Sequence, residues 1–423
     1  MAREMKDSGV AWIGEIPADW QIVKFSRIAS VKCNLVAPDD YLELPQISPE
    51  NIEKGSGKLL SYKTVEESGI ISGNHLFHEG QLLYSKIRPK LNKVCIVPFP
   101  GLCSADMYPI ESKQNIRFLM YCMLSDAFVG QVSMITEDRV KMPKINQDEL
   151  SSLLLAFPPT RSEQQAIANF LDSKCTEIDA VLNKTRTSIE EYKKLKQAII
   201  TQAVTKGVRG DRPMKESGIE WVPTIPADWE IIPSKRLFAD SDERKRPNDE
   251  LLTASQKYGV ISQRQYMERE KARVVLATQG IENWKHVEPY DFIISLRSFQ
   301  GGLEMSEVSG CITWHYIVLK PLRPIHSFFF KWLFKSELYI KALQRTCNFI
   351  RDGQDLRYSN FVQAPLFIPP MEEQKEIAGA LNVRCAEIDA LIQKKVLFVA
   401  ELESYKKSLI YEYVTGKKEA SQL

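Results

Sequence analysis

The chain contains two kinds of sequence block, and each kind occurs twice, about 210 residues apart. The first block contains Ile-Pro-Ala-Asp-Trp at Ile16 to Trp20 and again at Ile225 to Trp229. The second block contains Cys-x-Glu-Ile-Asp-Ala, which starts at Cys175 and again at Cys385. Between the blocks, residues 29–156 and 238–366 share little beyond their length. One scaffold, present twice, is therefore predicted to carry two different inserts.

Two similar halves are expected to lie about a rough twofold axis. Duplex DNA is the commonest ligand whose backbone has matching symmetry. Two unlike inserts on such a scaffold would read two unlike half-sites.

The composition is that of a globular protein, with 44% hydrophobic and 26% charged residues. A net charge of +2 argues against a histone-like polycation, so a DNA-binding protein of this kind must concentrate its positive charge locally. The eight Cys occur without a C-x-x-C pair, which favours reduced, buried thiols. The N-terminal residues lack an apolar signal core, and no apolar run approaches the ~20 residues of a membrane span. A soluble cytoplasmic protein is expected.

Each copy of the second block runs into a long stretch whose apolar residues recur in alternating steps of four and three, the seam of a coiled coil. Pro158-Pro159 and Pro369-Pro370 precede the two stretches, Thr160 and Glu163 form a capping box, and Gly207 and Gly416 are expected to end the helices. At ~1.5 Å per residue, each helix would be roughly 65 Å long, enough to hold two domains apart. The predicted seam consists of Leu171, Cys175, Ile178, Leu182, Ile189 and Ile199 in the first helix, and of Leu381, Cys385, Ile388, Ile392, Val399, Leu402 and Leu409 in the second.

The direction of the two helices is open from local connectivity, because residues 208–368 could return the chain to either end. The expected twofold axis requires an antiparallel pair. Lys196 and Lys406 occupy seam positions, where a charge lowers stability but disfavours wrong registers. Lys395 is expected to extend its ammonium group to solvent.

The two inserts are predicted to be mixed α/β domains with the same order of elements. The first has a strand, a basic turn and a second strand over 80–97, a further strand over 101–110, and a helix over about 116–133. The second has strands over 291–297 and 311–319 and a helix over 327–347. A polar, basic loop follows each helix. The expected fold class is α+β: two mixed α/β domains separated by two long antiparallel coiled-coil helices, with internal pseudo-twofold symmetry.

Basic and amide side chains cluster in the loops of both inserts. Such loops can hold phosphates and direct Arg or Gln to base edges, and paired glycines allow the backbone to approach a ligand closely. For each residue the alternative is an ordinary solvated turn, and Glu243 to Arg246 is assigned to such a turn. The candidate DNA contacts are Tyr84, Lys86, Arg88, Lys90, Lys93, Lys141 and Lys144 in the first insert, and Arg297, Gln300, Gly301, Arg351, Gln354 and Arg357 in the second.

An enzyme is the main alternative, and the motifs count against it. The adenine methyltransferase signature Asn/Asp-Pro-Pro-Tyr is absent, and Gly55-Ser-Gly-Lys58 lacks the first glycine of a phosphate loop. His75 and His78 with Cys95 or Cys103 are more typical of packed or surface residues than of a metal site. No catalytic group or metal site is therefore predicted. A coiled-coil scaffold that never contacts DNA would account for the helices but not for the paired basic loops.

Nearly the whole chain resembles the specificity subunit of type I restriction-modification enzymes. The resemblance rests on the order insert, helix, insert, helix, on Pro-Pro-x-x-x-Glu-Gln-Gln-x-Ile-Ala from Pro158, on Val414-Thr-Gly-Lys417, on Ser85-Lys-Ile-Arg-Pro89 and on Gly353-Gln-Asp-Leu-Arg357. Val204-Thr-Lys-Gly207 departs from the Val-Thr-Gly-Lys order, which puts only that helix end in doubt.

The resemblance implies two target recognition domains, 1–157 and 208–368, which each read one half of a split DNA sequence. Conserved spacer helices, 158–207 and 369–423, would set the gap and dock partner subunits. The implied partners are double-stranded DNA, two DNA methyltransferase subunits that modify adenine, and motor-nuclease subunits that cut DNA. This chain is expected to bind no cofactor itself, since S-adenosylmethionine, ATP and Mg would be held by its partners.

Overall fold

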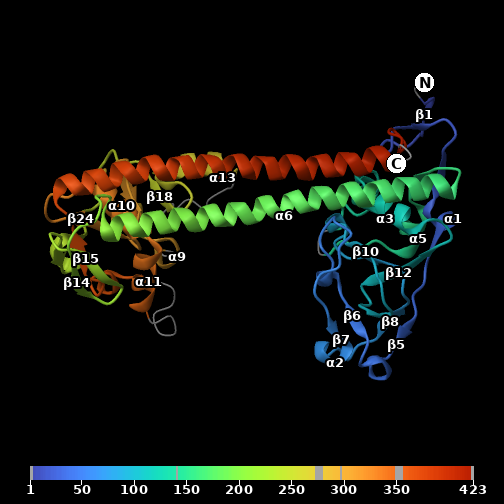
Figure 1. The fold of residues 1–423 in the computed structure, drawn as a ribbon, viewed down its shortest axis with the longest axis horizontal. Helices are drawn as coiled ribbons and strands as arrows, with labels where there is room; N and C mark the ends of the chain where they lie inside the picture. Colours follow the sequence, from blue (N-terminus) through green and yellow to red (C-terminus); the bar gives the residue numbers. More distant parts are fainter. Residues whose placement is uncertain (1–2, 140–141, 272–279, 296–297, 348–355, 421–423) are drawn as a thin grey trace. The chain divides into compact units, whose positions relative to one another are not determined.

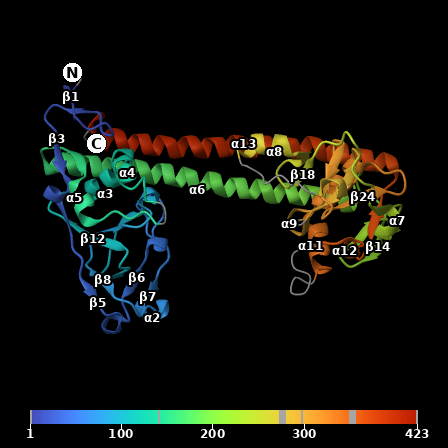
Figure 2. The ribbon, with the colours of Figure 1, turned by 180° about the vertical axis from the view of Figure 1, so that it is seen from behind.

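The computed structural model describes residues 3–139, 142–271, 280–295, 298–347 and 356–420. The chain divides into two compact units: Met1–Arg186 with Leu397–Leu423, and Thr187–Val396. Each unit combines one mixed α/β domain with parts of two long helices, α6 (Arg161–Lys206) and α13 (Met371–Val414), which lie side by side in Figures 1 and 2. The predicted α+β class with two mixed domains and two long helices is confirmed.

The domain of the first unit consists of short strands and helices, and the basic turn predicted within 80–97 lies between β9 and β10. Its elements are β1 (Met5–Asp7), β2 (Glu15–Pro17), β3 (Gln21–Lys24), α1 (Phe25–Ile28), β4 (Ala29–Val31), β5 (Leu35–Val36), η1 (Pro38–Tyr41), β6 (Pro45–Ile47), η2 (Pro49–Asn51), β7 (Lys63–Thr64), α2 (Val65–Ser68), β8 (Asn74–Phe77), β9 (Leu82–Ser85), η3 (Pro89–Leu91), β10 (Val94–Ile96), β11 (Gly101–Cys103), β12 (Met107–Ser112), α3 (Ile116–Leu124), α4 (Asp126–Ile135), α5 (Gln147–Ser152) and β13 (Leu154–Phe157).

The domain of the second unit follows the same order with local differences. Its elements are β14 (Met214–Ile219), β15 (Val222–Pro226), β16 (Glu230–Ile232), α7 (Ser234–Leu237), β17 (Phe238–Ser241), β18 (Leu252–Ser255), β19 (Gly259–Ser262), α8 (Gln263–Glu270), η4 (Ile281–Asn283), β20 (Lys285–Val287), β21 (Phe292–Ile294), α9 (Ser298–Gly301), β22 (Glu304–Met305), β23 (Gly310–Ile312), β24 (Ile317–Pro321), α10 (Ser327–Lys335), α11 (Glu337–Arg345), α12 (Tyr358–Phe361) and β25 (Leu366–Ile368).

The two domains share a four-stranded sheet with the same connectivity. Its order is β10-β9-β12-β4 in the first domain and β22-β21-β24-β17 in the second. In each, a helix pair covers the sheet and supplies large buried aromatic side chains, such as Phe118 and Phe128 in the first and Phe330 and Phe334 in the second. The common order predicted from sequence is therefore a common sheet topology. Burial of these rings against the sheet stabilises each domain.

The strands at the two ends of each insert pair with each other in a small antiparallel sheet. In the first unit β3 pairs with β13, and Leu155 lies opposite Val23. In the second unit β16 pairs with β25, and Phe367 lies opposite Ile231. β3 and β16 belong to the first repeated block, and β13 and β25 lead into the second repeated block at Phe157 and Phe367, so each variable insert begins and ends at one small sheet.

Each predicted insert helix is two helices, which corrects the sequence prediction. α3 ends and α4 begins at Ser125, and α10 ends and α11 begins at Ser336. The Ser125 hydroxyl donates to the carbonyl of Cys122, and the Ser336 hydroxyl accepts the amide of Tyr339. A serine that bonds locally to the backbone competes with a continuing helix, so the chain turns at the same place in both domains.

Two predicted strands are also interrupted. The stretch 101–110 divides into β11 and β12 at the turn Ser104–Asp106, and the stretch 311–319 divides into β23 and β24 at the turn Thr313–Tyr316. Such runs contain enough apolar residues to suggest one strand, but the two halves pair in different sheets.

The predicted seam residues are buried or half-buried in both units. Leu171, Ile178, Leu182 and Ile189 of α6 are buried, and so are Leu381, Ile388 and Leu409 of α13. Ile199, Ile392, Val399 and Leu402 are half-buried. The helices are antiparallel within each unit. In the first, Phe170 stacks on Tyr413 and Asp179 meets Lys406, and in the second, Tyr192 lies under Lys395 and Lys196 meets Asp389. Lys395 therefore rests on an aromatic ring rather than extending freely to solvent.

The seam lysines pair with the repeated aspartates of the opposite helix. Lys406 Nζ lies 2.7 Å from Asp179 Oδ1, and Lys196 Nζ lies 2.6 Å from Asp389 Oδ2. Burial raises the pKa of Asp179, but hydrogen bonds from Lys406 and Lys58 outweigh it and hold that pKa below its ordinary value. An aligned pair of this kind fixes one register, as a charge at a core position is expected to do.

The repeated Ile-Pro-Ala-Asp-Trp block anchors each domain to the start of a long helix. Trp229 Nε1 donates to Glu373 of α13 at 3.0 Å, and Arg212 binds the same carboxylate. In the first unit Trp20 Nε1 and Arg3 bind Glu163 of α6 at 3.1 and 2.9 Å. The predicted capping box is therefore half-formed, since the Thr160 hydroxyl accepts the Glu163 amide while the Glu163 carboxylate is used by Trp20 and Arg3.

The long helices end where the sequence predicts. α6 stops before Gly207, and α13 stops two residues before Gly416, and both glycines have positive φ. Within the described residues, no single helix has the length and apolar composition to span a membrane; α3 and α4 reach them only together, and they meet at 61°.

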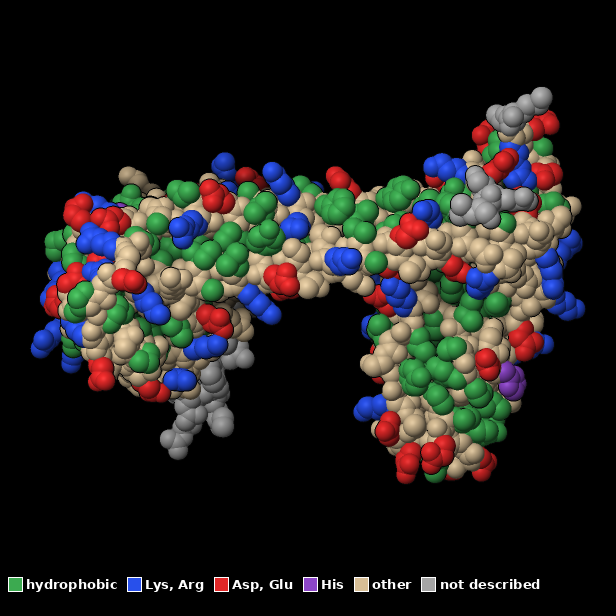
Figure 3. All heavy atoms as spheres, viewed as in Figure 1, with side chains coloured by type: hydrophobic (Ala, Val, Ile, Leu, Met, Phe, Trp, Pro, Cys, Tyr) green, Lys and Arg blue, Asp and Glu red, His purple; other side chains and the backbone are tan. Residues whose placement is uncertain are grey.

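Large apolar side chains remain exposed on α13. Figure 3 shows green side chains on the surface of the helix pair. On α13 the exposed ones are Val383, Leu391, Val396, Leu397, Phe398 and Tyr405. An apolar helix surface of this kind is typical of a protein–protein contact.

Candidate nucleic-acid interface

Two basic loops that are far apart in the sequence form one surface in the first unit. The loop after β9 lies against residues 142–145: Ile87 forms a β-bridge with Lys144, and the Arg88 amide donates to Pro143 at 2.8 Å. Arg88 has a φ of 45°, uncommon for a residue with a side chain, and its side chain is exposed. Within the described part of the chain it has no carboxylate partner. A free guanidinium held on a rigid hairpin suits a groove contact.

A third loop, which the sequence analysis missed, completes this surface. The Lys86 amide donates to the carbonyl of Asp106 at 3.0 Å, and Lys144 Nζ lies 3.2 Å from Asp106 Oδ1. The Lys86 ammonium lies over the Tyr108 ring, 5.5 Å from its centroid. The surface therefore combines cations with a carboxylate, which can accept from cytosine N4. The only sequence signal for it is the Ser-Ala-Asp turn inside an otherwise apolar run.

The Lys86 charge acts to lower the pKa of two side chains at the rim of this surface, Cys33 and His75. Gln147 Nε2 donates to the Cys33 sulfur at 3.4 Å. Burial lowers the pKa of His75, and the nearby Lys86 charge lowers it further. Burial raises the pKa of the Cys33 thiol. At neutral pH both groups are therefore uncharged, so the positive charge of the rim comes from lysine and arginine.

Two predicted contacts in this loop have other roles. Tyr84 is 0% exposed and packs edge-to-face on Phe128, so its prediction as a DNA contact is wrong. On β9 the Tyr84 side chain lies on the side covered by α3 and α4. The sequence of a single apolar-rich strand does not show which of its two sides is buried. Lys93 is half-buried, and its ammonium donates to the carbonyl of Pro49 at 2.6 Å.

Lys90 faces the long helices instead of the other loops. It lines a pocket of about 350 Å³ between the domain and the helix pair. In the same pocket Lys58 Nζ lies 2.6 Å from Asp179 Oδ2, so the Gly55-Ser-Gly-Lys58 loop fastens the domain to α6. In the second unit Asp389, the counterpart of Asp179, pairs with Lys196 of α6 and with no described residue of the domain.

The second unit has an equivalent loop between β21 and β22. Gln300 is exposed there, and Gly301 and Gly302 follow it, the latter with a φ of 77°. A side chain at Gly302 would collide with the Phe334 carbonyl, so the loop packs closely on α10. Arg357 is exposed at the start of α12. The predicted contacts Lys141, Arg297, Arg351 and Gln354 lie outside the described residues.

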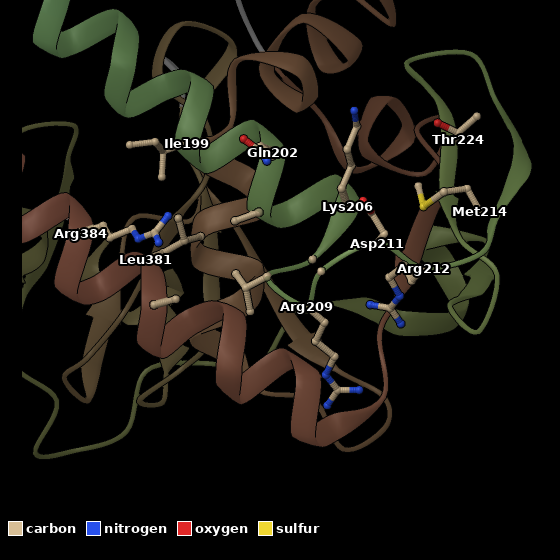
Figure 4. A pocket seen from close by; sticks show the side chains of 15 residues that line it. Ile199, Gln202, Lys206, Arg209, Asp211, Arg212, Met214, Thr224, Leu381 and Arg384 are labelled. Atoms are coloured by element: carbon tan, nitrogen blue, oxygen red, sulfur yellow. The ribbon is translucent and has the colours of Figure 1, made fainter.

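A cavity of about 490 Å³ lies in the second unit where α6 leads into β14 (Figure 4). Its lining contains Lys206, Arg209, Arg212 and Arg384, whose side chains point in different directions in Figure 4. Arg209 is bound to Glu376 at 2.8 Å and Arg212 is bound to Glu373. We interpret the cavity as a junction between helix and domain, since its cations do not converge on one point.

Comparison with known proteins agrees with this arrangement. Residues 17–191 match the type I restriction modification DNA specificity domain. The Type I restriction enzyme EcoDI specificity subunit of Escherichia coli is 36% identical over 207 residues, which are 48% of this chain and 46% of that protein. The putative type I restriction enzyme MjaX specificity subunit of Methanocaldococcus jannaschii is 24% identical over 421 residues, 96% of this chain and 95% of that protein. The first part of the chain is therefore similar to the specificity domain of type I restriction-modification systems.

A solved chain of the type I R-M system has the same fold. Its TM-score is 0.69 at 15% identity, and the match covers 95% of this chain and 99% of that one. The alignment with the E. coli specificity subunit spans about half of that protein's length. The family match includes the basic loops of the first domain and the first part of α6.

Proposed function

We propose that the chain is the DNA-recognition subunit of a type I restriction-modification complex and contributes no catalytic group. Each domain reads one half of a split target, and the paired helices set the gap between the halves. The observation that carries the proposal is the common sheet topology of two domains whose loops differ. Different side chains on one frame suit the reading of two different half-sites.

The proposed partners are duplex DNA, two adenine-modifying methyltransferase subunits and motor-nuclease subunits, in the cytoplasm of a prokaryotic cell. S-adenosylmethionine, ATP and Mg would be bound by those partners. The exposed apolar side chains of α13 support docking of a methyltransferase subunit on the helices. The similarity to type I specificity subunits supports the same assembly.

The direct test is to map DNA methylation in cells that express the chain with its methyltransferase partner. A split motif, two short sequences separated by a gap of fixed length and any sequence, is expected. A contiguous motif, or no methylation above the level of cells lacking the chain, would contradict the proposal. A gel shift on random duplex should weaken as salt rises, because phosphate contacts release counterions. No shift at any salt would favour a scaffold that does not contact DNA.

Specificity is expected to be modular. Replacing residues 29–156 by the insert of a relative should change one half of the methylated motif and leave the other half and the gap unchanged, because the insert begins and ends at one small sheet, in which β3 pairs with β13. The matched experiment replaces residues 238–366 and should change the other half. If either exchange alters both halves, the domains do not read independently.

Arg88 is expected to contribute about 1–3 kcal/mol to specific binding if it forms a bidentate contact to guanine. Arg88→Ala would then weaken binding to the target more than to random duplex. Arg161→Ala is the matched control, because Arg161 is also exposed but lies at the start of α6. Fluorescence anisotropy at several salt concentrations separates the two roles. An equal loss on both duplexes, with a smaller salt slope, would assign Arg88 to a phosphate.

A further inference from the structure

The turn between β23 and β24 presents an exposed tryptophan. Trp314 is 52% exposed, and its ring stacks on His315 with centroids 3.5 Å apart and an interplanar angle of 28°. Neither residue belongs to the buried cores of the second unit. A large aromatic side chain held outside the core loses little mobility on binding and offers a large apolar area.

The sheet places this turn at the edge where β21 ends and the chain leads on toward Gln300. Ile294, at the end of β21, pairs with Ile317, at the start of β24. The chain that follows Ile294 and the chain that precedes Ile317 therefore leave the sheet at the same edge. Trp314 and His315 thus belong to a turn at the edge of the sheet where β21 ends.

The first domain shows what the corresponding turn does. There Ser85, at the end of β9, pairs with Met107, at the start of β12. The turn before Met107 is Ser104–Asp106, and Asp106 contacts both Lys86 and Lys144 of the basic surface. The two domains have the same strand order, so Trp314 occupies the place of a group that is part of the candidate interface.

The stacking on His315 restricts how Trp314 can contact DNA. A wedge inserted between base pairs needs both faces of its ring free. One face of Trp314 is covered by His315, so insertion is disfavoured. The free face and edge remain for an apolar contact in the major groove, where the exposed apolar group of a base pair is the 5-methyl of thymine.

We propose that Trp314 reads the 5-methyl group of a thymine in the half-site of the second domain, an inference that rests on the proposed function. If the modified base is adenine, each half-site contains at least one A·T pair and therefore a thymine methyl. Trp314 would discriminate that pair by burial of the methyl group against the indole. His315 would hold the ring in place.

The test uses the full chain with its methyltransferase partner and duplexes that carry the mapped target. The half-site of the second domain is the half left unchanged by exchange of residues 29–156. Each thymine of that half is replaced singly by deoxyuridine, which removes only the methyl group. Wild type and Trp314→Ala are compared on every duplex, with Trp314→Phe as the conservative variant.

For wild type, one deoxyuridine position is expected to weaken binding about fourfold, the effect of one buried methyl-sized group. Trp314→Ala should weaken binding to the thymine duplex by about fourfold to tenfold and become indifferent to that position, whereas Trp314→Phe should keep part of the sensitivity. The inference is overturned if no deoxyuridine weakens wild-type binding, or if Trp314→Ala and deoxyuridine act additively. Wild type that does not distinguish the target from random duplex would overturn the proposed function, and this inference with it.

Discussion

Replacing Glu373 by alanine is expected to destabilise the second unit by about 3–5 kcal/mol, the usual cost of removing one partner of a buried ion pair. The Glu373 side chain is 0% exposed and accepts hydrogen bonds from Arg212 and from Trp229 Nε1. The substitution leaves a guanidinium and an indole N–H without their acceptor inside the protein. Hydrogen exchange should show lost protection in β14 to β16 and at the start of α13, where these groups meet.

Two matched variants make this result specific. Glu376 lies one turn further along α13 and also pairs with an arginine, Arg209, but both are well exposed. Glu376→Ala should therefore leave protection unchanged within error, since exposed ion pairs contribute little. Glu163→Ala removes the partly exposed counterpart in the first unit and should have an intermediate effect confined to that unit. Equal effects of Glu373→Ala and Glu376→Ala would show that the anchor is not what stabilises the unit.

Lengthening both helices by one heptad is expected to lengthen the gap of the target by roughly three base pairs. Duplication of residues 181–187 in α6 and 391–397 in α13 adds about 10 Å at 1.5 Å per residue and keeps the seam in phase. These segments occupy equivalent positions in the repeat. Three base pairs also rotate the DNA by roughly 100°, and twisting of the duplex compensates for only part of this rotation. The methylation activity should therefore fall, while the methylated motif shows the longer gap. Methylation mapping gives the gap directly.

The control for the double-heptad variant is an insertion that disrupts the seam between the two long helices. Four residues added after Thr187 in α6 alone should misalign Lys196 with Asp389 and abolish assembly with the methyltransferase partner. Size-exclusion chromatography of the co-expressed proteins would report that loss. An active double-heptad complex that still methylates the original gap would show that the helices do not set the spacing.

The helices could be predicted almost completely from the sequence. The alternation of four and three from Leu171, the prolines before each helix and the glycines after it are local signals, and the structure follows them. The partner of each seam lysine could not be predicted, because Lys406 and Asp179 meet only when two distant segments pack. The breaks at Ser125 and Ser336 had a signal, since each serine is followed by an acidic residue, a pattern typical of a new helix start.

The candidate interface could be predicted only in part. The basic character of the loops around Arg88 and Lys144 is visible in the sequence, and the structure brings these loops together. Their contact with Asp106 depends on sheet pairing between strands that the sequence suggested were one. Tyr84 was misplaced because a strand alternates sides, and only the covering helix decides which side is buried. Tyr290 has a φ of 77° where the first domain has Gly80, a strained conformation that no sequence pattern announces.

The salt bridge between Lys58 and Asp179 has a consequence for chimeric proteins. The lysine belongs to the exchangeable insert, whereas the aspartate belongs to the repeated scaffold. If the incoming first domain has no cation at that position, the Asp179 carboxylate pairs with Lys406 alone. The domain then lacks one of the contacts that orient it on α6. The second position makes no such demand, because Asp389 pairs with Lys196 of α6 and with no described residue of the second domain. The two insert positions of the scaffold therefore place different requirements on a grafted domain. In a library of grafted domains, more should give a folded, active chain at the second position than at the first.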